Sequence, residues 1–247
     1  MRKVVVLVLS SVCTFPIAAN AGGLDFLNRL ADMADKADDK NSSGGVTEDA
    51  LNNFVKEGGE ADKLFIKARG GLLSALSSKD DRAKVLNDQK AMNECQQSND
   101  KKNTAECKQL NDSLEARARA ATANEQAAEN AKKLDQTQKK ELAVSGYNMV
   151  LASMRMTKQV QIGQTLMQGA RTNYFLLPKI FGAKDAMSSL MGNAQSAGQY
   201  AVTIPQLFKS ADIQIEFPKD AASAPKDTTE FDSLGYSYAA CCLCKFS

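Results

Sequence analysis

The chain has 247 residues, of which 31 are basic, 29 are acidic and none is histidine or tryptophan. The lack of histidine excludes the usual general base near neutral pH, the Ser–His and Cys–His nucleophile pairs, and most zinc and copper sites. A nearly balanced charge provides no concentrated basic surface for nucleic acid. We therefore expect a non-enzymatic protein with no cofactor and no nucleic-acid partner.

The N-terminal segment is typical of a cleavable export signal. Two basic residues, Arg2 and Lys3, precede an apolar stretch that ends close to the small residues Ala19 and Ala21. This layout predicts a signal peptide over residues 1–21 and a periplasmic or secreted mature chain. No second apolar stretch reaches the roughly 20 residues that a transmembrane helix needs.

Apolar residues at three- and four-residue steps predict short helices in the first part of the chain. The first covers residues 24–37, and a polar linker follows over 38–45. Thr47, with two acidic residues behind it, is typical of a helix N-cap. Two glycine pairs, at 58–59 and 70–71, are expected to interrupt or bend the helix that follows.

A further helix is expected to begin at Ser77 or Ser78 and to end near Cys95. The next segment, 104–170, contains no proline and is rich in strong helix formers, so we expect one long central helix there. Its first half carries a narrow alanine-rich seam that suits close contact with another helix. The seam consists of Ala116, Ala120, Ala123, Ala127, Ala131 and Leu134.

The second half of this helix has a broader apolar surface, which predicts burial among several helices. Methionines are frequent there and in the following segment. We interpret them as core residues, with an adaptable apolar groove as the alternative. They are Met149, Met154, Met156, Met167, Met187 and Met191.

The last third of the chain is expected to be broken more often. Pro178 and Gly182 are expected to end one element, residues 185–195 have the apolar spacing of a helix, and Pro205 is expected to start a short turn. Alternating apolar and polar residues over 213–217 predict a minor strand-like segment.

The expected architecture is all-α, an elongated helical hairpin or bundle around the long central helix. The helical domain covers residues 22–217 and includes a long coiled hairpin at about 79–170. Residues 218–232 offer little to bury, so the cysteine-containing tail over 218–247 is expected to be flexible.

Cys95 and Cys107 lie twelve positions apart in a polar stretch. In an oxidising compartment this spacing predicts a disulfide that staples a helical hairpin beside its turn, with two free thiols as the alternative. A loop of this size stabilises a fold by about 3 kcal/mol in the chain-entropy estimate.

Three more cysteines, Cys241, Cys242 and Cys244, make the number of mature cysteines odd. Thiolates can bind a soft metal, but the tail offers no imidazole to complete a site. An intermolecular disulfide or an incidental terminus is favoured, so we assign no metal site there.

Residues 39–50 follow the order of an EF-hand calcium loop as far as Thr47. The twelfth position, where such loops have a bidentate glutamate, is Ala50. A plain linker is favoured, because the same residue types are ordinary turn and capping residues.

The function that these observations favour is a non-enzymatic helical scaffold or interaction protein of a cell-envelope complex. Its alanine-rich helix would bind another protein or a second copy of the chain. One alternative is a periplasmic carrier that holds an apolar molecule among residues 147–208. A second alternative is calcium binding through the loop at 39–50.

Overall fold

The computed structural model describes residues 46–97, 104–123, 125–170 and 177–227. Within these ranges six helices pack together and no strand is present, which confirms the expected all-α bundle. The predicted signal peptide, the predicted helix over 24–37 and most of the calcium-type loop lie outside the described residues.

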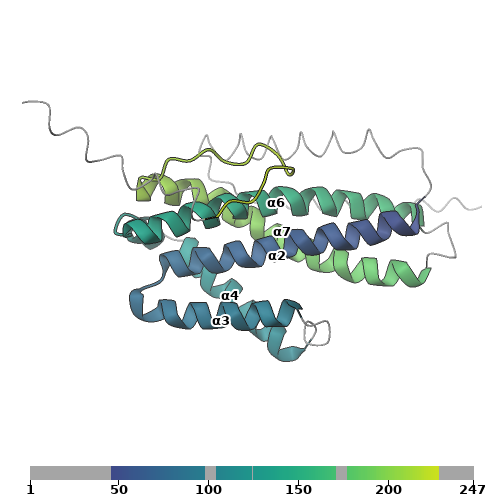
Figure 1. The fold of residues 1–247 in the computed structure, drawn as a ribbon, viewed down its shortest axis with the longest axis horizontal. Coiled ribbons are helices and arrows are strands. Elements are labelled where there is room, and N and C mark those ends of the chain that lie inside the picture. The colour runs from purple at the N-terminus through teal and green to yellow at the C-terminus, as the bar shows by residue number, and fades with distance from the viewer. Residues whose placement is uncertain (1–45, 98–103, 124, 171–176, 228–247) are drawn as a thin grey trace, which may run out of the picture.

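Three long helices form the body of the molecule: α2 (Glu48–Leu76), α6 (Gln136–Ala170) and α7 (Leu177–Ala211). They extend along the long axis in Figure 1, with α6 packed against both of the others. α6 runs antiparallel to α2, because Gly71 faces Ser145 towards one end of the pair and Gly163 faces Phe54 towards the other.

Neither glycine pair interrupts α2, so the interruption predicted at 58–59 was wrong. The helix is continuous for 29 residues. It begins as predicted at Thr47, whose Oγ1 accepts a hydrogen bond from the N–H of Ala50 at 3.2 Å. A Cβ added at Gly71 would lie 2.0 Å from Ser145 Oγ, so the glycine is used for close approach of α6. Packing along the helix outweighs the roughly 1 kcal/mol that a helical glycine costs.

The segment expected to form one long helix is divided into three. α4 covers Ala105–Thr122, α5 covers Glu125–Ala131, and α6 follows. α6 begins with a capping box, because Asp135 Oδ1 accepts from the N–H of Gln138 at 2.8 Å and Gln138 Oε1 accepts from the N–H of Asp135 at 3.2 Å. Helix propensity alone could not show this boundary.

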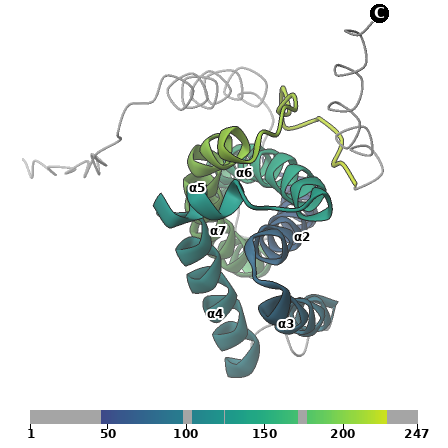
Figure 2. The same cartoon turned by 90° about the vertical axis from the view of Figure 1, so that its left-hand side faces the viewer.

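α3 (Lys79–Gln97) and α4 form a helical hairpin beside α2, which we call the arm. The two helices diverge from their connected ends, and α4 crosses towards α7 (Figures 1 and 2). Ser78 Oγ accepts from the N–H of Asp81 at 3.2 Å, which confirms the predicted start of α3. Among its described side chains α3 buries Val85, Met92 and Cys95, and almost all its other side chains are partly or fully exposed.

α7 continues through the positions at which breaks were predicted. Pro178 and Gly182 lie in its first two turns, and Pro205 lies in its last two. The first turn of a helix tolerates proline, since the missing N–H has no helical partner there. Residues 185–195 are helical, as predicted.

The C-terminus of α7 has a specific cap. Asp212 follows the helix with a φ of 55°. The N–H of Ile213 donates to the carbonyl of Phe208 at 2.9 Å, and the N–H of Asp212 donates to that of Lys209 at 3.3 Å. This pair of hydrogen bonds is a Schellman motif, which turns the chain back towards the bundle.

Residues 213–227, which we call the strap, then run along α6 without forming a strand (Figure 1). The alternation over 213–217 therefore has a different cause from the predicted one. Ile213 is buried, and the ring of Phe217 stacks on Phe208 with centroids 5.4 Å apart. Gln214 and Glu216 are exposed, as one side of an extended chain would be.

The beginning of the predicted flexible tail is also held in place. Asn148 Nδ2 donates to the carbonyl of Lys226 at 2.8 Å and accepts from its N–H at 2.9 Å through Oδ1. Arg155 donates to the carbonyls of Ala221 and Ser223 at 3.0 and 2.8 Å. These bonds use backbone groups of the strap, which composition cannot reveal. Residues 228–247, with the three terminal cysteines, lie outside the described residues.

Candidate functional site

The predicted alanine seam is divided between the interior and the surface. Ala127 and Ala131 of α5 are buried in the core, as a seam residue should be. The buried stripe of α4 is different and consists of Cys107, Leu114, Ala118 and Thr122. Its leucine buries more apolar surface than an alanine can, which favours this orientation of the helix.

The remaining alanines of the seam are exposed on the outer side of the arm. We call Ala116, Ala120 and Ala123 the alanine face. All three side chains remain exposed when the rest of the described chain is packed around them. Within the described part of the chain, the alanine face is therefore exposed.

A buried arginine fastens the arm to the body. Arg69 of α2 is 1% exposed, and its Nη1 donates to Glu115 Oε2 at 3.0 Å. Its Nη2 donates to Asn111 Oδ1 at 2.8 Å, and its guanidinium lies 5.4 Å from the ring centroid of Phe65. A buried guanidinium is tolerable only when its donors are paired, so α4 is held at one register on α2.

Glu115 connects the same cluster to α7. It accepts from Arg119 Nε at 2.8 Å, and Arg119 Nη2 donates to Ser196 Oγ at 2.9 Å. Burial acts to raise the pKa of Glu115, but hydrogen bonds from Arg119, Ser196 and Arg69 outweigh it and lower the pKa. The ionised carboxylate is thus the stable form in this cluster.

Tyr200 completes the contact between α4 and α7. Its hydroxyl donates to the backbone carbonyl of Glu115 at 3.3 Å. Burial first, and then the neighbouring Glu115 charge, raise its pKa above the ordinary tyrosine value. A tyrosine that stays protonated is a hydrogen-bond donor here, so Tyr200 helps to orient α4 against α7.

Two further contacts hold α3. The geometry of Cys95 and Cys107 fits the predicted disulfide, with Cα atoms 5.9 Å apart and both residues buried. An ion pair also joins the two helices of the arm, because Arg117 Nη1 of α4 lies 2.6 Å from Asp88 Oδ2 of α3.

At its start, α3 is fastened to the body. Arg82 of α3 donates to Ser74 Oγ of α2 at 3.2 Å, and its guanidinium also forms an ion pair with Glu141 of α6. The arm is thus secured at its base, along its length and near its turn.

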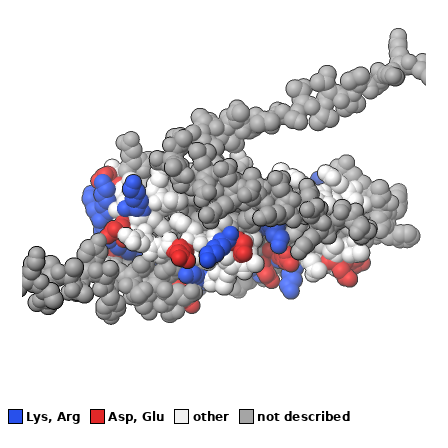
Figure 3. Space-filling view, turned by 90° about the horizontal axis from the view of Figure 1, so that it is seen from above, with Lys and Arg blue, Asp and Glu red and all other residues white. Residues whose placement is uncertain are grey.

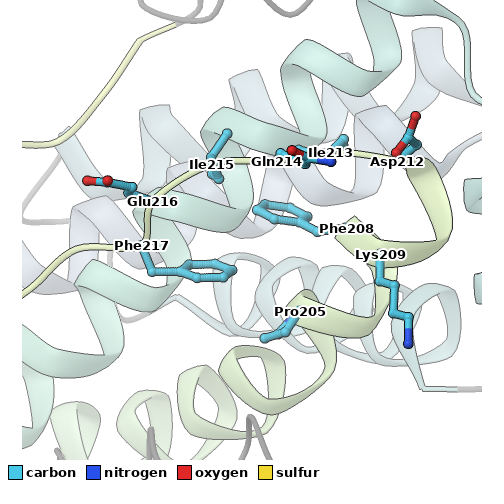
Figure 4. A pocket seen from close by; sticks show the side chains of 9 residues that line it. All are labelled: Pro205, Phe208, Lys209, Asp212, Ile213, Gln214, Ile215, Glu216 and Phe217. Atoms are coloured by element: carbon cyan, nitrogen blue, oxygen red, sulfur yellow. The ribbon is translucent and has the colours of Figure 1, made fainter.

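An open groove lies at the end of α7, beside the strap (Figure 4). It has a volume of about 600 Å³ and is open to solvent. The rings of Phe208 and Phe217 lie next to each other in it, and Lys209 extends away from them. It is not lined by the methionines, most of which are buried in the core as predicted: Met149, Met154, Met156 and Met187.

Within the described ranges, no group of three or more Cys, Asp or Glu residues is arranged to hold a metal ion. No helix in those ranges is both long and apolar enough to cross a membrane. In the space-filling view of Figure 3, basic and acidic side chains lie mixed over the visible face.

Comparison with known proteins gave no match to this chain, whether with family models, with curated proteins or with solved structures.

Proposed function

We propose that the chain is an exported, non-enzymatic protein of the cell envelope that binds another protein, or a second copy of itself, through the alanine face. The observation that carries this proposal is the exposure of Ala116, Ala120 and Ala123 on an arm that the buried Arg69 holds in one register. A rigid support reduces the ordering cost of association.

Small side chains suit such a contact for two physical reasons. They let the backbone of a partner helix approach to about 8 Å, near the close end of helix packing. Alanine also loses no rotamer freedom when it is covered, so little conformational entropy opposes binding.

The neighbouring surface of α7 is also uncharged. Residues 186–208 contain no charged residue. Gly192 and Gln199 lie within one turn of Ser196, which contacts α4, and neither is buried in the body. A partner helix with small or apolar residues would therefore meet no unpaired charge on this side.

The test compares Ala120→Glu with the control Ala83→Glu, which places the same charge on an exposed position of α3 away from the alanine face. Size-exclusion chromatography with light scattering on the full chain is expected to show a dimer that only A120E reduces to monomer. If the wild type is monomeric, envelope pull-downs with the two variants as bait replace this measurement. A complex that both variants keep, or no complex in either assay, contradicts the proposal.

The groove at the end of α7 favours a second candidate function, a carrier of an apolar molecule. Its volume of about 600 Å³ lies within the range of small-molecule sites. Native mass spectrometry of the full chain is expected to detect a retained ligand if this is correct. Substitution Phe217→Ala should then release that ligand, and a ligand-free mass spectrum counts against a carrier.

Calcium binding stays a prediction, because residues 39–45 lie outside the described part of the chain. Where the described structure begins, Thr47 caps α2 and Ala50 lies in its first turn. Calorimetry with calcium tests the loop directly, and no heat at millimolar ion would exclude this function.

A further inference from the structure

A second, more polar cleft lies between α2, α6 and the turn of the strap. Its volume is about 240 Å³. Glu57 and Glu60 come from α2, and Arg155, Lys158 and Gln159 come from α6. Arg155 holds the strap over this cleft by donating to two of its carbonyls. Three elements that are distant in sequence therefore build one site.

The two helices give the cleft walls of opposite charge. The wall from α2 carries two carboxylates, and the wall from α6 carries two cations. Neither Glu60 nor Lys158 forms an ion pair within the described residues, although they lie across the same cleft. The charges are placed for a guest that carries both signs.

Gln159 provides a second and independent observation. Its side chain is 5% exposed, and its Nε2 donates to Glu57 Oε2 at 2.5 Å. Its Oε1 is buried and has no hydrogen-bond partner in the described structure. A buried acceptor without a donor is energetically costly, and such atoms are rare in folded proteins. Because Oε1 itself has almost no solvent-accessible surface, a guest in this cleft reaches it only after the Gln159 amide turns towards the cleft.

We propose that this cleft binds a small zwitterion, an amino acid or a short peptide. The ammonium group of the ligand lies against the α2 wall, where it donates to the carboxylates of Glu57 and Glu60. The carboxylate of the ligand lies against Lys158. This site is separate from the alanine face and from the groove at the end of α7.

The test is an NMR titration of the full chain with L-alanine, followed at the backbone amides of Lys158, Gln159 and Ala222. Saturable shifts are expected with half-saturation below about 10 mM. Ethylamine and acetate, which each carry one of the two charges, are expected to bind about tenfold more weakly. Equal responses to all three compounds, or no saturable response to L-alanine, overturn the proposal.

Variants assign the two walls. Lys158→Met and Glu57→Gln are each expected to weaken L-alanine binding about tenfold. Lys184→Met, which removes an exposed lysine of α7 outside the cleft, is the matched control and is expected to leave binding unchanged. Binding that survives K158M, or that K184M weakens equally, contradicts the assigned orientation and with it the zwitterion site.

Discussion

The body and the arm of this molecule are held together by different forces. α2, α6 and α7 bury broad apolar surfaces, and glycines such as Gly163 allow their side chains and backbones to approach closely. The arm buries a narrow stripe and depends on a buried arginine, ion pairs and a cysteine pair. The comparison shows that apolar packing fixes the body, whereas a few specific polar contacts fix the position of the arm.

The largest effect is expected where the arm meets the body. Arg69→Met should lower the free energy of unfolding by about 4 kcal/mol, because Glu115 Oε2 and Asn111 Oδ1 lose the buried guanidinium that donates to them. Arg117→Met is the control, since its ion pair with Asp88 is partly exposed on both sides and should cost at most about 1 kcal/mol. Urea unfolding measures both. Equal losses would contradict the claim that the buried ion pair contributes more to stability than the partly exposed one.

The cysteine pair should have the next largest effect. The double variant Cys95→Ser with Cys107→Ser is expected to lower the free energy of unfolding by about 3 kcal/mol, since the unfolded chain gains the entropy of an open loop. Non-reducing peptide mapping of the wild type should recover the two cysteine peptides linked. Free alkylation of both thiols would exclude the disulfide.

Substitutions that disturb close packing in the body should have a smaller effect on stability. In Gly163→Ala the new Cβ would lie 2.7 Å from Phe54 Cε2 and from Met187 Sδ, so overpacking should cost about 2 kcal/mol. Gly59→Ala meets no atom within 4 Å and should instead stabilise α2 by about 0.5–1 kcal/mol. Thermal unfolding of the two variants should therefore shift in opposite directions. Shifts of the same sign would contradict the packing described for α6.

The smallest effect is expected at the start of α6. Asp135→Ala removes the side chain that caps the N–H of Gln138 and should cost about 1 kcal/mol. Asp112→Ala, an exposed position on α4, is the control and should change stability little. Comparable losses in the two variants would show that charge rather than capping is responsible.

The sequence predicted those helix starts that are capped by a side chain close to them in the chain. Thr47 and Ser78 are side-chain caps, and each is found at the predicted place. The capping box of Asp135 and Gln138 was readable in the same way, but uniform helix propensity on both sides concealed it. The overall all-α fold followed from the same propensities.

Features that depend on distant contacts could not be predicted. Gly71 resembles a helix breaker until Ser145 is seen against it. Arg69 resembles a surface residue, because nothing local reveals that Asn111 and Glu115 will pair with it. The strap from residue 218 onward was expected to be mobile because its apolar content is low, yet its backbone carbonyls are bound by side chains of α6. Of the candidate site, the sequence predicted the alanines but not which of them would face outward.

Native-state hydrogen exchange, with the cysteine pair oxidised and then reduced, tests the division between body and arm most directly. The account predicts that reduction lowers the protection of amides in α3 and α4, while buried amides of α2, α6 and α7 keep their high protection. An equal loss of protection in all five helices would contradict it, because the arm and the body would then unfold as one unit.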